Sequence, residues 1–171
     1  MVNRELADLL VQYRAIEFGD FTLASGAKSS FYIDVKTAVT HPDLLAAVAE
    51  TVAASFEFDV VAGVAVGGVP LATATALAAK KPYAIIRSQG KDHGKKDLII
   101  GHVTGKQVLL IEDVTTSGGS AIYGIETLRA EGARIDTVVT VVDREQGAGE
   151  MLANKKVRLA PLVRVSEIKK E

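Results

Sequence analysis

Two neighbouring carboxylates and a loop rich in hydroxyls and glycines follow one apolar stretch of the sequence. Glu112 and Asp113 come directly after the apolar residues 108–111, and the loop after them leads into a segment whose apolar residues have helical spacing. Backbone N–H groups at the start of a helix favour a phosphate, and carboxylates accept hydrogen bonds from sugar hydroxyls. The pattern therefore predicts a sugar-phosphate site, in which the loop residues are Thr115, Thr116, Ser117, Gly118, Gly119 and Ser120.

Each half of this pattern also has an ordinary structural explanation, because capped helix starts and acidic pairs on loops are common. Their direct succession after an apolar strand favours a functional site. The sequence contains no standard nucleotide-binding motif. Residues 101–106 are one residue short of a Walker loop, and there is no G-x-G-x-x-G. The three histidines lack the spacing of metal ligands; they are His41, His93 and His102.

Two other segments bear on phosphate binding. The turn Val66, Gly67 and Gly68 follows an apolar run, and taken alone its glycines favour tight packing of a strand on a helix, although they would also let backbone N–H groups approach phosphate oxygens closely. Residues 80–97 carry six Lys and Arg against two Asp, so this window is suited to anions. A solvated hairpin would have the same composition.

Length and composition indicate one globular domain, residues 1–171, with 48% hydrophobic residues. Because the chain has no Cys, disulfides, thiolate metal sites and a cysteine nucleophile are excluded, and the cytoplasm is the expected compartment. The net charge of −1 argues against general nucleic-acid binding. Residues 60–79 are uncharged over the length of a membrane span, but their central glycines and Pro70 favour a buried strand, a loop and a helix.

The expected elements alternate between strands and helices, which predicts an α/β fold with a mostly parallel central sheet. Ligands of such sheets bind beyond the carboxyl ends of the strands. An amphipathic N-terminal helix is expected to use Leu6, Leu9, Leu10, Tyr13 and Ile16 on one face. Strands are expected at 21–24, 30–35, 59–65, 82–87, 107–112, 135–142 and 157–163, and further helices from 42, at 69–80 and at 120–131.

Residues 108–121 resemble the signature of type I phosphoribosyltransferases, which bind 5-phosphoribosyl 1-pyrophosphate (PRPP). Three further segments occur in the expected order and resemble orotate phosphoribosyltransferases. They correspond to the N-terminal hood at 21–34, the mobile catalytic loop at 87–94 and the orotate-binding loop at 143–147. The resemblance implies the type I phosphoribosyltransferase fold, with a small hood formed mainly by residues 18–38 and the C-terminal segment.

The resemblance also implies a reaction: transfer of the phosphoribosyl group from PRPP to N1 of orotate, a pentosyltransferase step of pyrimidine biosynthesis. Glu112 and Asp113 would hold the ribose, residues 115–120 the 5-phosphate, and the turn 66–68 the pyrophosphate. The implied catalytic residues are Arg87, Lys91, His93 and Asp113, and those that contact orotate are Thr116, Arg144, Ser25, Gly26 and Tyr32. Mg2+ is expected through PRPP, without direct protein ligands. A homodimer is expected, with the mobile loop shared between subunits.

The sequence departs from well-known bacterial relatives at Ala24, Gly67 and Ser88, where those relatives carry lysines. Lys28, Lys36 or Mg2+ are the candidates for the missing charge. Two alternative functions stay open. A phosphoribosyltransferase for another base, such as a purine, has no use for Arg144, and a PRPP-sensing regulator on the same fold needs no cationic loop.

Overall fold

The central sheet has six strands in the order β5-β4-β3-β6-β7-β8. The computed structural model describes residues 4–22, 26–88 and 98–168. Neighbouring strands run parallel, except that β5 pairs antiparallel with β4 at one edge. The strands are β3 (Val60–Val64), β4 (Tyr83–Ile86), β5 (Ile99–Ile100), β6 (Val108–Thr115), β7 (Thr137–Asp143) and β8 (Arg158–Arg164).

The middle strands are buried on both faces of the sheet. Every residue of β3 and β7 is buried, and in β6 only Val114 is partly exposed. Strands covered on both faces lose the alternation of apolar and polar residues, because neither face meets water. The uninterrupted apolar runs of the sequence have this cause, and the predicted α/β fold with a mostly parallel sheet is confirmed.

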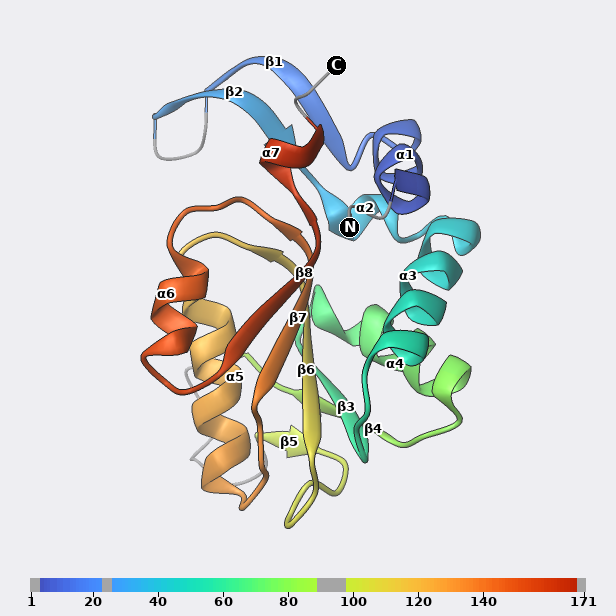
Figure 1. The fold of residues 1–171 in the computed structure, drawn as a ribbon, viewed down its shortest axis with the longest axis vertical. Helices are drawn as coiled ribbons and strands as arrows, with labels where there is room; N and C mark the ends of the chain where they lie inside the picture. Colours follow the sequence, from blue (N-terminus) through green and yellow to red (C-terminus); the bar gives the residue numbers. More distant parts are fainter. Residues whose placement is uncertain (1–3, 23–25, 89–97, 169–171) are drawn as a thin grey trace.

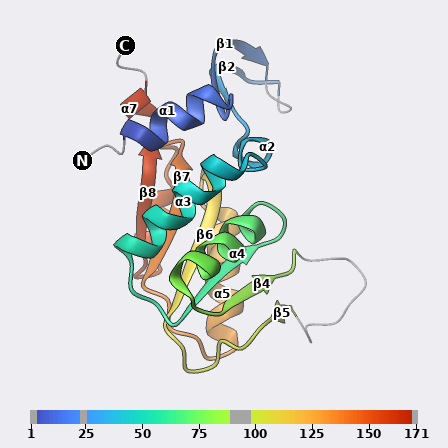
Figure 2. The same cartoon turned by 90° about the vertical axis from the view of Figure 1, so that its right-hand side faces the viewer.

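Helices cover both faces of the sheet, as Figures 1 and 2 show. Consecutive residues of β6 point to opposite faces. Leu109 and Ile111 therefore pack into one core cluster, which includes Leu44 and Leu71, whereas Leu110 packs into the other, which includes Ile125. The helices of the two layers are α1 (Arg4–Gln12), α3 (Pro42–Ser55) and α4 (Gly68–Ala79) on one side, and α5 (Gly119–Ala130) and α6 (Ala148–Ala153) on the other.

A two-stranded antiparallel hairpin, β1 (Ile16–Thr22) and β2 (Lys28–Ile33), stands apart from the main sheet. It lies beyond the end of the sheet at which β8 finishes, together with the short helices α2 (Val35–Ala38) and α7 (Val165–Ile168) (Figure 1). Since β3, β6, β7 and β8 are mutually parallel, this is the end where their carboxyl termini lie. We call this group of β1, β2, α2 and α7 the hood.

Several predicted bounds are wrong, mostly in the hood. The first strand begins at Ile16, which therefore does not belong to the N-terminal helix, and Val35 belongs to α2 and not to a strand. The hairpin is largely exposed, so it lacks the apolar periodicity from which a strand is recognised. The short elements α6 and β5 were not predicted, because six and two residues are too few to show a period.

No helix in the described ranges is long and apolar enough to cross a membrane. The uncharged stretch 60–79 is divided into β3, a glycine turn and α4, as its sequence indicates.

Candidate active site

The two carboxylates occupy a part of β6 that extends beyond its neighbour β3. The pairing of β6 with β3 ends at Ile111, which lies opposite Gly63, whereas the pairing with β7 continues to Thr115. Glu112 and Asp113 are 3% and 6% exposed. They therefore lie at the carboxyl edge of the sheet, where β3 has turned away into the loop before α4.

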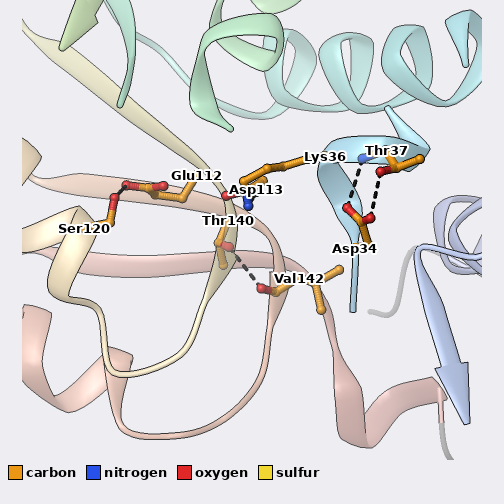
Figure 3. Close-up of polar contacts among 8 residues, drawn as sticks. All are labelled: Asp34, Lys36, Thr37, Glu112, Asp113, Ser120, Thr140 and Val142. Atoms are coloured by element: carbon orange, nitrogen blue, oxygen red, sulfur yellow. Dashed lines mark hydrogen bonds and ion pairs between the residues drawn. The ribbon is translucent and has the colours of Figure 1, made fainter. Parts of the chain in front are cut away.

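The two side chains contact different elements, as Figure 3 shows. The Ser120 hydroxyl, at the start of α5, donates a hydrogen bond of 2.9 Å to Glu112 Oε1. Asp113 Oδ2 forms an ion pair with Lys36 Nζ of α2, at 2.9 Å. Successive residues of a strand point to opposite faces, so a doublet that is adjacent in sequence is divided between the two sides of β6.

Glu112 is almost fully buried. Thr140 lies opposite it on β7, but the Thr140 hydroxyl donates to the Val142 carbonyl at 3.1 Å (Figure 3). Burial raises the pKa of Glu112 to about 7, and the nearby Asp113 charge adds to the rise, while the Ser120 hydrogen bond and Lys36 oppose it. Glu112 therefore changes its charge near neutral pH.

We expect Glu112→Gln to stabilise the protein above neutral pH. The folded state holds the Glu112 proton up to about pH 7, whereas an unfolded glutamate releases it near 4.5. Stability is thus lost as the pH rises between these values and stays lost above them. The amide keeps an oxygen for Ser120 and carries no charge, so the free energy of unfolding should rise by roughly 1–3 kcal/mol at about pH 8 and little at about pH 4.

Urea unfolding at the two pH values measures this difference. Glu150→Gln removes one negative charge from an exposed position on α6 and serves as the control. An equal gain for Glu112→Gln at both pH values would contradict the burial argument.

Gly67 lies against the Asp113 carboxylate. A Cβ atom on residue 67 would lie 2.5 Å from Asp113 Oδ2 and 2.6 Å from its Cγ, so the carboxylate would have to shift to admit a side chain. Gly68, the next residue, is confined in the same way, because its Cβ would lie 2.7 Å from the Ile111 carbonyl oxygen. The turn that begins at the exposed Val66 is thereby held beside the acidic end of β6.

The loop between β6 and α5 presents exposed groups beside the start of that helix. Gly118 has a φ of +88°, which favours glycine, and a Cβ there would lie 3.0 Å from Leu152 Cδ1 of α6. Thr116, Ser117 and Gly119 are exposed. The Thr115 hydroxyl is buried and donates to Asp143 Oδ1 at 3.2 Å, so Thr115 links β6 to β7. Free N–H groups in the first turn of α5 complete a surface suited to a phosphate.

Arg144 connects this loop to the hood. Its backbone N–H donates to the Thr115 carbonyl at 3.0 Å, and the Ala148 N–H donates to the Thr116 carbonyl at 3.2 Å. The guanidinium lies over the Phe31 ring of β2, 4.9 Å from the ring centre. Arg144 Nε is buried and has no hydrogen-bond partner among the described residues. A half-buried cation therefore faces the space between the hood and the loop.

Comparisons with known proteins agree with this geometry. A family model described as "Phosphoribosyl transferase domain" matches residues 35–162. The orotate phosphoribosyltransferase of Methanocorpusculum labreanum is 64% identical over 168 residues, which cover 98% of this chain and 99% of that protein. The chain belongs to the orotate phosphoribosyltransferase family.

Solved structures of the family have the same fold. The crystal structure of orotate phosphoribosyltransferase from Aeropyrum pernix aligns with a TM-score of 0.83 at 34% identity, over 95% of each chain. The Mycobacterium tuberculosis enzyme, solved in complex with PRPP, aligns with a TM-score of 0.77 at 30% identity, over 96% of each chain. The family assignment therefore covers the hood as well as the main sheet.

The remaining residues implied by the family resemblance lie just after β4, on the hood hairpin, or outside the described part. Arg87 is exposed at the end of β4, where its backbone N–H donates to the Leu98 carbonyl at 2.8 Å and its carbonyl accepts from the Tyr123 hydroxyl at 2.8 Å. Gly26 and Tyr32 are exposed on the hood hairpin. Three of the predicted site residues lie outside the described residues: Ser25, Lys91 and His93.

Sequence reasoning did not identify the contacts that Lys36, Phe31 and Asp143 make in this site. Lys36 was only one of two candidate lysines for a missing charge, because nothing in its local pattern places α2 beside β6. Phe31 lies in the segment assigned to the hood and Asp143 in the segment assigned to the orotate-binding loop, but their contacts with Arg144 and Thr115 arise only from the tertiary arrangement.

Proposed function

We propose that this chain transfers the 5-phosphoribosyl group of PRPP to N1 of orotate, releasing pyrophosphate and forming orotidine 5-monophosphate. The family assignment gives the reaction class. The observation that carries the proposal is the placement of three groups at the carboxyl end of β6: Asp113 lies against the turn Val66–Gly68, and the Thr116–Gly119 loop leads from β6 to Ser120, whose hydroxyl donates to Glu112. These groups match the three parts of PRPP: ribose, pyrophosphate and 5-phosphate.

Each group has a distinct part in the proposed mechanism. Glu112 and Asp113 accept hydrogen bonds from the ribose hydroxyls, and the N–H groups of the α5 first turn hold the 5-phosphate. Breaking the glycosidic bond leaves positive charge on the ribose and negative charge on the departing pyrophosphate. The buried carboxylates stabilise the positive charge on the ribose. Cations stabilise the negative charge on the departing pyrophosphate, most strongly in the transition state. We assign the stabilisation of the departing pyrophosphate to Arg87, Lys91 and His93.

Arg144 selects the base in this proposal. Orotate differs from uracil by a carboxylate, and a guanidinium offers a planar pair of donors that suits it. The guanidinium lies over the Phe31 ring, and its Nε atom has no hydrogen-bond partner among the described residues. These two observations support a guanidinium that is held in one orientation and has a donor available for the base. Thr116, Ser25, Gly26 and Tyr32 are the other proposed orotate contacts.

Mg2+ is part of the proposal as an ion carried by PRPP. Carboxylate and phosphate oxygens are the ligands that Mg2+ prefers, and in this proposal the ribose oxygens bind beside Asp113 and Glu112. No group of three His, Asp or Glu side chains in the described ranges is arranged to hold a metal ion, so most of its ligands would come from PRPP and water. The bound ion would neutralise charge on the pyrophosphate.

The homodimer and the sharing of the 87–94 loop between subunits stay proposals that rest on the family resemblance. Sedimentation of the purified protein tests the first. Mixing an Arg144 variant with a Lys91 variant tests the second: activity should return only if one subunit's loop serves the other subunit's site.

The function is tested by incubating the protein with PRPP, Mg2+ and a panel of bases, while the loss of base and the release of pyrophosphate are followed. We expect turnover of orotate and none of adenine or guanine. A preference for a purine would establish the first alternative function. Tight PRPP binding without pyrophosphate release for any base would instead indicate a PRPP-sensing regulator.

A further inference from the structure

Lys36 places a positive charge at the acidic end of β6. Its Nζ atom lies 2.9 Å from Asp113 Oδ2, and its side chain is 63% exposed while Asp113 is almost fully buried. One side of the ammonium group therefore contacts the carboxylate and the other is open to solvent. Contact with Asp113 raises the pKa of Lys36, which outweighs the opposing effect of its partial burial, so the group is charged at neutral pH.

The hood holds this lysine in place through α2. The Asp34 side chain caps the helix, accepting hydrogen bonds from the Thr37 N–H at 3.0 Å and from the Thr37 hydroxyl at 2.7 Å (Figure 3). Val35 and Ala38, on either side of Lys36 in the helix, are buried in the core. Lys36 thus extends toward β6 from a short helix that is fixed at its start and anchored by its apolar residues.

Gly67 brings the turn close to the same carboxylate without adding a charge. The same Asp113 Oδ2 atom lies 2.9 Å from Lys36 Nζ and 2.5 Å from the point where a Cβ of residue 67 would lie. A side chain at 67 would displace the carboxylate that Lys36 contacts. With glycine at 67 the turn lies against Asp113 without disturbing this ion pair, and the turn itself carries no cation.

The other candidate lysine is engaged in the hairpin. Lys28 Nζ donates to the Thr22 hydroxyl at 2.9 Å, across the two strands β1 and β2. Of the described residues, Lys36 is the cation that forms an ion pair with the acidic doublet. Without it, two neighbouring carboxylates would repel an incoming pyrophosphate.

We propose that Lys36 is a donor-site residue, whose ammonium group binds the pyrophosphate of PRPP beside the turn Val66–Gly68 while it neutralises Asp113. This inference rests on the proposed function, which supplies the donor. Lys36 supplies a positive charge that Gly67 does not carry, and it reaches the turn from the hood rather than from the main sheet.

The test compares Lys36→Met, which keeps the apolar stem and removes the charge, with Lys36→Arg, which keeps the charge. We expect Lys36→Met to raise KM for PRPP and the calorimetric Kd for inorganic pyrophosphate by about tenfold or more, and Lys36→Arg to recover most of the loss. KM for orotate and the Kd for ribose 5-phosphate should change by less than about threefold. Lys155→Met is the matched control. Lys155 also forms an ion pair, at 2.6 Å with Glu126 of α5, but this pair is partly exposed and has no assigned part in the site.

Three results would overturn the inference. Unchanged pyrophosphate binding in Lys36→Met removes Lys36 from the donor site. An equal loss for pyrophosphate, ribose 5-phosphate and orotate, with a lower Tm, reduces the ion pair to a structural contact. A larger loss of pyrophosphate binding in Lys28→Met than in Lys36→Met assigns the charge to Lys28. If the wild-type protein fails to consume orotate, the proposed function fails, and the pyrophosphate titration still decides the role of Lys36.

Discussion

Gly67→Ala should lower kcat/KM for PRPP by about 100-fold, equivalent to roughly 2.7 kcal/mol of transition-state stabilisation. The added methyl group would lie within 2.7 Å of three atoms of the Asp113 carboxyl group, so that group must rotate or shift. Asp113 is a short side chain at the edge of the sheet, and its movement costs little folding energy. It would, however, lose the position from which it holds the ribose and contacts Lys36.

The variant separates a functional effect from a folding effect. We expect a Tm close to that of the wild type, a much higher KM for PRPP and a weaker pyrophosphate affinity, with orotate affinity less affected. Gly149→Ala is the matched control, because a Cβ at residue 149 of α6 meets no atom within 4 Å. A fall in activity that matches a fall in Tm, or normal activity in Gly67→Ala, would contradict the close-contact argument.

Arg144→Ala should lower kcat/KM for orotate by about 100- to 1,000-fold, because the carboxylate of the base would lose a charge-assisted pair of hydrogen bonds in a partly buried site. KM for PRPP should change by only a few-fold, since no PRPP contact is assigned to this side chain. The Phe31 ring would lose the cation above it, so a modest loss of stability in the hood is also expected.

Initial rates at varied orotate and fixed PRPP, and the reverse, measure this division. Arg144→Lys should recover only part of the orotate affinity, because an ammonium group lacks the planar pair of donors. Arg158→Ala, an exposed arginine at the opposite end of the parallel sheet, is the control. Equal losses for both substrates in Arg144→Ala would show that the substitution disturbs the loop between β6 and α5 and not only the recognition of the base.

The sequence alone determined the fold class and the centre of the site. The runs 108–111 and 138–142 are short, rich in β-branched residues and without alternation, and between helical segments such runs predict buried parallel strands. Glu112, Asp113 and the residues up to Ser120 belong to one continuous segment. Because these residues are neighbours along the chain, they lie close together independently of the rest of the fold.

Contacts between distant segments were decided by the tertiary structure. The sequence shows Glu112 and Asp113 as a pair, but the geometry of β6 divides them between Ser120 on one side and Lys36 on the other. The reason for glycine at 67 is the Asp113 carboxylate, and the partner of Arg144 is Phe31 of the hood. Such contacts depend on how strands and helices far apart in the chain pack together. Packing is set by the whole core, so no local spacing of residues encodes it.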